Sequence, residues 1–116
     1  MPYNMELEQR LDRFTDRLGK FTKKKMFGGI CYLMNGNMVF GIHRQSLVIR
    51  TSTERAEELL KGEHVSLFDM TGRPMKGWLL ISPNGLETEE KILELLNLCI
   101  EYVSILPKKV GKLETK

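Results

Sequence analysis

Hydrophobic residues recur at helical spacing near the start of the chain. The residues that share one face of this pattern are Leu7, Leu11, Phe14 and Leu18. Steps of three and four residues are the repeat of an amphipathic helix. Asn4 is a good N-cap before the pattern, and Gly19 is a good C-cap after it. We therefore predict a helix between these two residues.

Three β-prone runs follow, at residues 30–33, 38–42 and 46–50. The first two runs flank Asn35-Gly36, and this dipeptide is the strongest short signal for a two-residue hairpin turn. Arg44-Gln45 makes a second tight connection, between the second run and the third. The pattern predicts a meander of three antiparallel strands.

The second half of the chain alternates between the same two patterns. The expected elements are a helix with a capping box at Thr51 and Glu54 and an end at Gly62, strands at Val65–Phe68 and Met75–Ser82, and a long helix from Thr88 to Pro107. On the second of these strands, Leu79 and Ile81 point to one side and Trp78 to the other. The order helix, three strands, helix, two strands, helix predicts an α+β two-layer sandwich with an antiparallel sheet.

Length and composition agree with this architecture. With 116 residues, 41% of them hydrophobic and 28% charged, the chain has the composition of a soluble globular domain. We place one domain at residues 1–109 and a mobile basic tail at residues 110–116. Residues 1–10 carry acids without an apolar run, and polar residues interrupt the apolar stretch at 92–106. Neither a signal peptide nor a membrane-spanning helix is expected, so the predicted compartment is the cytoplasm.

The cysteines and histidines do not form a recognisable catalytic or metal site. Cys31 and Cys99 lack the short spacing of a zinc or redox motif, and we expect both to be reduced and buried. His43 and His64 have no nucleophile or orienting carboxylate at motif spacing. We therefore expect no cofactor, no metal and no enzymatic activity.

The run from Lys23 to Gly29 is the most unusual stretch of the sequence, since three cations precede two large apolar residues and a glycine pair. We interpret Met26 and Phe27 as core residues, and Gly28 and Gly29 as a bulge or a point of tight packing. A ligand or partner groove is the alternative. The cations Lys23, Lys24 and Lys25 are interpreted as a solvated linker, with an acidic or nucleic-acid partner as the alternative.

Three further residues are candidates for contact with a partner. Trp78 and Lys76 share the sheet face that the helices are not expected to cover, and an aromatic side chain there suits an interface anchor. Arg73, after Gly72, could bind an anion or a partner carboxylate, although capping of backbone carbonyls is the simpler interpretation.

The expected function is therefore a protein-interaction module, with a homodimer or another protein as the partner. The alternative is a nucleic-acid-binding module that uses Lys20–Lys25 and the C-terminal lysines, although the net charge of +3 is by itself too small to indicate one. A small-molecule enzyme or sensor is a more distant third.

An ordered series of short motifs resembles one known family. These motifs are Met26-Phe27-Gly28-Gly29, Gly36, Gly72-Arg73-Pro74-Met75-Lys76-Gly77-Trp78, Ser82-Pro83 and Leu106-Pro107-Lys108-Lys109. Together they resemble the N-terminal domain of the TfoX/Sxy family over roughly residues 5–109.

The resemblance carries its own expectations. It implies a fold similar to type III secretion chaperones, with the order α-β(3)-α-β(2)-α. Full-length relatives regulate competence-gene transcription together with a cyclic-AMP receptor protein, and they carry an additional helical C-terminal domain. The family has no established catalytic residues. The positions that the resemblance marks as structurally important are Met26, Phe27, Gly28, Gly29, Gly72, Arg73 and Pro83.

Overall fold

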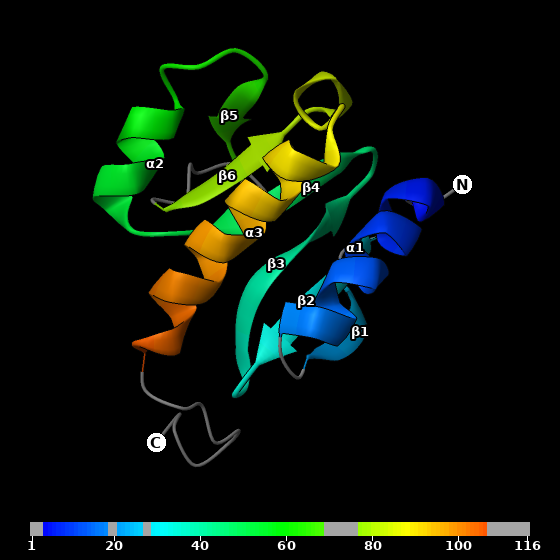
Figure 1. The fold of residues 1–116 in the computed structure, drawn as a ribbon. Coiled ribbons are helices and arrows are strands. Elements are labelled where there is room, and N and C mark those ends of the chain that lie inside the picture. The colour runs from blue at the N-terminus through cyan, green and yellow to red at the C-terminus, as the bar shows by residue number, and fades with distance from the viewer. Residues whose placement is uncertain (1–3, 19–20, 27–28, 69–76, 107–116) are drawn as a thin grey trace.

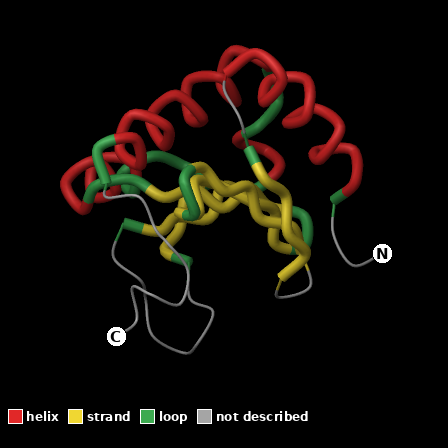
Figure 2. The backbone as a smooth tube through the Cα atoms, turned by 90° about the horizontal axis from the view of Figure 1, so that it is seen from below, coloured by secondary structure: helices red, strands yellow, loops and turns green. Residues whose placement is uncertain are grey.

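The computed structural model describes residues 4–18, 21–26, 29–68 and 77–106. The elements in chain order are α1 (Met5–Leu18), β1 (Thr22–Met26), β2 (Gly29–Met34), β3 (Asn37–His43), β4 (Ser46–Arg50), α2 (Thr53–Leu59), β5 (Val65–Leu67), β6 (Trp78–Ile81), the 3₁₀ helix η1 (Pro83–Gly85) and α3 (Glu89–Ser104). The strands form one antiparallel sheet, and the helices lie against one of its faces (Figures 1 and 2). This confirms the predicted α+β class with two layers. The predicted tail at 110–116 lies outside the described residues.

The sheet contains one strand more than the sequence pattern predicted. Its order is β1-β2-β3-β4-β6-β5, and the additional strand is β1 at one edge. The interpretation of Lys23–Lys25 as a linker was wrong, because these lysines pair with Tyr32, Cys31 and Ile30 of β2. An edge strand needs only one hydrogen-bonded neighbour and keeps its side chains in water, so it can form without an apolar alternation.

The turns and helix starts follow local side-chain chemistry. Asn35 (φ 55°) and Gly36 (φ 81°) both have positive φ, as the predicted hairpin turn requires. Asn4 accepts a hydrogen bond from the backbone of Leu7 at 3.0 Å, which confirms it as the cap of α1. For α2 the predicted cap was one residue early, because the hydroxyl of Ser52, rather than that of Thr51, accepts from the backbone N–H at the third helical position.

The main core lies between the sheet and the two longer helices. The core residues from these two helices are Leu7, Leu11 and Phe14 of α1 and Ile92, Leu95, Leu96, Cys99 and Val103 of α3. On β6, Leu79 and Ile81 are buried in this core, whereas Trp78 and Leu80 are half-buried. The predicted assignment of Trp78 to the opposite face is therefore confirmed.

That opposite face is not covered by the described helices, as expected, but its centre is buried (Figure 2). Cys31, Gly41 and Val48 stand in one row across β2, β3 and β4. The exposed fraction is 4% for Cys31 and 2% for Val48, and Phe68 beyond β5 is also buried. The ring of Phe68 packs edge-on against His43 at 5.4 Å. The outer face is therefore partly packed rather than free.

Gly29 is a point of close packing, as the sequence suggested. A Cβ atom built on Gly29 would collide with the carbonyl oxygen of Ile42 on the neighbouring strand β3. A glycine is therefore required where β2 begins. Its neighbours Gly28 and Phe27 lie outside the described residues.

Candidate interaction groove between α2 and α3

The second helix is held loosely against the rest of the domain. Ala56 is the buried residue of α2, and Leu59 and Leu60 are partly buried. Figure 1 shows α3 running between α1 and α2, and the side of α3 toward α2 borders two hollows of about 480 and 430 Å³. Both hollows are lined by Leu59, Lys91 and Leu95, so they form one continuous depression. We call it the α2–α3 groove.

The floor of the groove is apolar. Leu59 of α2 and Leu95 and Leu98 of α3 line it, and Leu95 is itself almost fully buried, with an exposed fraction of 3%. Leu98 is half-buried, and the main core of the described residues forms without it. A third hollow of about 220 Å³ extends the groove past Leu98 to Ile105, whose exposed fraction is 77%. Apolar side chains are therefore accessible along one side of α3.

The rim of the groove is mainly acidic. Glu58 and Glu63 border it on the side of α2, and Glu94 and Glu101 border it on α3. Residues 51–106 contain ten Asp and Glu but five Lys and Arg, whereas residues 1–50 contain four acids and nine bases. The groove thus lies in the acidic part of a chain whose net charge is positive.

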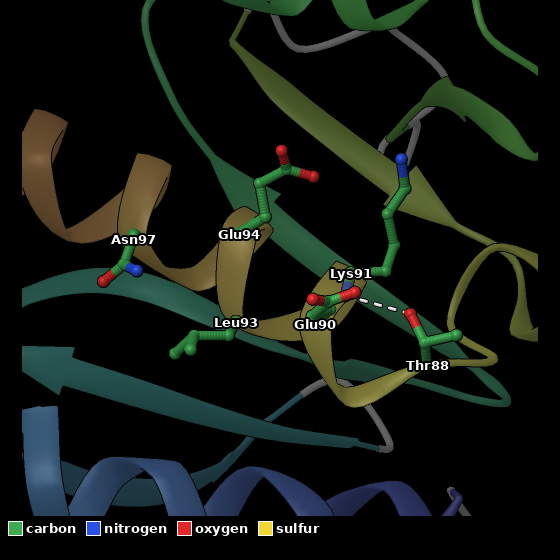
Figure 3. A pocket seen from close by; sticks show the side chains of 6 residues that line it. All are labelled: Thr88, Glu90, Lys91, Leu93, Glu94 and Asn97. Atoms are coloured by element: carbon green, nitrogen blue, oxygen red, sulfur yellow. Dashed lines mark hydrogen bonds between the residues drawn. The ribbon is translucent and has the colours of Figure 1, made fainter.

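Figure 3 shows how the side chains leave α3 near its start. Glu94 and Lys91 project to one side of the helix, and Leu93 projects to the other. Together with Thr88, Glu90 and Asn97 they line a shallow hollow of about 520 Å³. The Thr88 hydroxyl accepts a hydrogen bond from the backbone N–H of Lys91 at 3.1 Å, which caps the helix where the groove begins.

One lysine of the predicted basic patch, Lys23, is held in ion pairs with acidic residues of α1. The Nζ atom of Lys23 lies 2.6 Å from a carboxylate oxygen of Glu8 and 3.1 Å from one of Asp12, and Tyr32 donates a hydrogen bond to Asp12 at 2.8 Å. Burial lowers the pKa of Lys23, but the hydrogen bonds and charges of Glu8 and Asp12 outweigh it and raise the pKa above its usual 10.5. Lys23 therefore joins β1 to α1, although its side chain remains 37% exposed.

Trp78 lies beneath an arginine that sequence reasoning missed. The guanidinium of Arg50 lies 5.1 Å from the centre of the Trp78 indole and 5.9 Å from that of the Tyr102 ring, and it donates a hydrogen bond to the carbonyl of Met38 at 3.3 Å. Arg50 stands directly opposite Trp78 in the pairing of β4 with β6. Knowledge of that pairing would have identified Arg50 as the neighbour of Trp78, but the sequence alone does not determine the register between β4 and β6.

The remaining predicted site residues are separated in space or lie outside the description. Met26 ends β1, and Pro83 begins η1. Phe27, Gly28, Gly72, Arg73 and Lys76 lie outside the described residues. Those candidates that the structure describes are therefore spread over several elements, and the α2–α3 groove was not among the predicted sites.

The thiols of the described part are poorly suited to nucleophilic chemistry. Burial raises the pKa of Cys31, and it raises the pKa of Cys99 to about 12. A thiol with a raised pKa holds little of the reactive thiolate at neutral pH. Within the described ranges, no group of three His, Cys, Asp or Glu side chains is placed to hold a metal ion.

The family model of the TfoX N-terminal domain matches residues 12–103, which is most of the chain. The chain belongs to the TfoX N-terminal domain family. Most of its groove lies inside the TfoX match, because the lining residues from Arg55 to Glu101 fall within the matched span, whereas Ile105 lies just beyond it. Comparisons with curated proteins and with solved structures gave no match. No helix in the described part of this TfoX domain is long and apolar enough to cross a membrane.

Proposed function

We propose that this TfoX N-terminal domain is a cytoplasmic protein-interaction module of a regulatory type, which acts by binding and not by catalysis. The observation that supports this most directly is the α2–α3 groove, where an apolar floor ends at the exposed Ile105. Accessible apolar surface beside charged residues is typical of protein-binding sites. Membership of the family supports the regulatory part, because TfoX relatives act in competence-gene transcription.

Binding of nucleic acid is the alternative, and Lys24 and Lys25 on the edge strand β1 are the residues that favour it. Both are exposed, but Lys23 beside them is occupied by Glu8 and Asp12. The three Tyr of the sequence do not alternate with these cations, as they would on a stacking surface for single strands. The described surface therefore favours a protein partner.

The test is affinity capture with the full chain as bait, carried out at moderate salt with and without nuclease. We expect a specific protein that is enriched over a tag-only bait and persists after nuclease treatment. Loss of all captured protein on nuclease treatment, together with a duplex or single-strand shift that weakens steeply with salt, would replace this proposal with the nucleic-acid alternative. Capture of nothing from extracts at physiological concentration would contradict both.

A further inference from the structure

We propose that the α2–α3 groove binds a short amphipathic helix of a partner protein, with leucine-like side chains on one face and lysine or arginine on either side of that face. The inference rests on the proposed function and specifies the chemistry of the partner. Helices of this kind bind other proteins by laying an apolar stripe into a groove. The floor, the rim and the length of the groove each contribute to the assignment.

The floor fits an apolar stripe. Leu59 and Leu98 supply half-buried aliphatic side chains from two facing helices beside the buried Leu95, and Ile105 adds an exposed one at the end. Leu98 is outside the main core formed by the described residues, so its apolar surface is available to a ligand. A matching row of leucine side chains would remove this surface from water.

The rim determines the charge of the partner. Four glutamates, Glu58, Glu63, Glu94 and Glu101, border the groove, against Arg55 and Lys91. Long basic side chains can extend along apolar surface and place their charges beside these carboxylates. Complementary charge raises the association rate and selects against acidic partners.

The length of the groove fits a helix of a few turns. Its lining runs along α3 from Lys91 to Ile105, which corresponds to about 21 Å of helix at 1.5 Å per residue. A partner helix of roughly 14 residues would cover it.

A second copy of the chain is a poor occupant, as far as its described residues show. Its helix α1 carries Arg10, Arg13 and Arg17 but also four acidic residues, and the apolar face of α1 is buried in its own core. The other basic run is part of the edge strand β1. A separate partner therefore fits the groove better.

The probe is a labelled 14-residue peptide of lysine and leucine with leucines at helical spacing, measured by fluorescence anisotropy against the full chain. Two controls have the same length: a scrambled order of the same residues, and a version with glutamate in place of lysine. We expect the helical lysine peptide to bind at least about tenfold more tightly than either control.

Matched variants locate the binding. Glu58→Lys reverses a charge on the rim, and Glu57→Lys makes the same change at the neighbouring exposed position of α2, which does not line the groove. Leu98→Glu places a charge in the floor, and Met5→Glu places one at an exposed apolar residue of α1. We expect Glu58→Lys to weaken binding about tenfold and Leu98→Glu to abolish it, whereas both controls retain it within about twofold. Circular dichroism shows that each variant is folded.

Other occupants would give different results, and each would overturn the inference. Tighter binding by a synthetic peptide of residues 107–116 would assign the groove to the chain's own C-terminus. Self-association in sedimentation that Leu98→Glu removes would assign it to a second copy. An equal loss of peptide affinity for Glu57→Lys and Glu58→Lys would show that the peptide is attracted by the overall charge of the domain and not by the groove. A captured partner that binds the Leu98→Glu chain as well as the unaltered chain would leave the proposed function standing and remove this groove from it.

Discussion

Single residues of this domain are constrained most strongly where two backbones meet. At Gly29 a Cβ atom would collide with the Ile42 carbonyl. At Gly77, φ is +83°, and a Cβ atom would lie 2.6 Å from the carbonyl oxygen of Thr51. The backbone N–H of Thr51 also donates a hydrogen bond to the Gly77 carbonyl at 2.8 Å, so these two backbone segments cannot move apart freely. Gly29 begins β2 and Gly77 precedes β6, and both strands carry core residues.

We expect Gly29→Ala and Gly77→Ala each to lower the free energy of unfolding by more than about 1 kcal/mol, because the methyl group has no space and Gly77 has positive φ. Gly62→Ala is the matched control, since its added Cβ would meet its nearest neighbour at 3.4 Å and its φ is not positive. Urea denaturation of the three variants measures the difference. A loss at Gly62 as large as at Gly29 would contradict the steric explanation.

The sequence pattern predicted which face of the sheet a side chain occupies better than it predicted which residues that side chain contacts. Alternation along β6 correctly placed Leu79 in the core and Trp78 on the other face. The cation over Trp78 could not be predicted, because Arg50 reaches it through the pairing of β4 with β6. The role of Leu98 was also missed, because the helical repeat of α3 shows that Leu98 lies off the buried face but not that it borders a groove.

At the scale of elements, the short strand β1 shows where periodicity fails. Each predicted strand had apolar residues or a hairpin signal, but β1 has the sequence Thr-Lys-Lys-Lys-Met. It is held by backbone pairing to β2 and by the ion pairs of Lys23 with Glu8 and Asp12 of α1. These contacts join residues far apart in the sequence, so a local pattern cannot show them. The α2–α3 groove was unpredictable for a similar reason, because it depends on how far α2 stands from α3.

The ion pairs of Lys23 predict a pH dependence. Its pKa is raised in the folded state, so its contribution to stability is complete below the unfolded pKa near 10.5 and is lost as the pH rises through the folded pKa. We expect Lys23→Met to lower the free energy of unfolding by at most about 1 kcal/mol at pH 7, because the side chain is partly solvated. The difference from the unaltered chain should shrink above pH 10.5.

Chemical denaturation between pH 7 and pH 11 measures this difference. Lys24→Met is the control, since Lys24 alternates with Lys23 along β1 and points to the other sheet face. A Lys23→Met difference that stays constant across the alkaline range would contradict the role of the ion pairs.

At the scale of the whole molecule, stability is distributed unevenly across the sheet. The strands β2, β3 and β4 lie at its centre beneath α1 and α3, whereas β5 is a three-residue edge strand. The helix α2 joins the centre to that edge and has Ala56 as its buried residue. Regions with little buried apolar surface open more readily than the core does.

Hydrogen exchange should reveal this difference. We expect the amides of α2 and β5 to exchange at least about tenfold faster than those of β3 and α3, because local opening there exposes little apolar surface. Peptide-level mass spectrometry under native conditions measures the rates. Protection of α2 equal to that of β3 would mean that the helix is held more firmly than its packing indicates.

The lysines of β1 affect whether copies of the domain associate with one another at high protein concentration. The open edge of a sheet can recruit the same edge of a second molecule and begin a growing fibre. Two copies that met antiparallel along β1 would place one lysine row against the other, and repulsion would oppose the backbone hydrogen bonds. The lysines that were candidates for a binding patch therefore also oppose edge-to-edge pairing of two copies along β1.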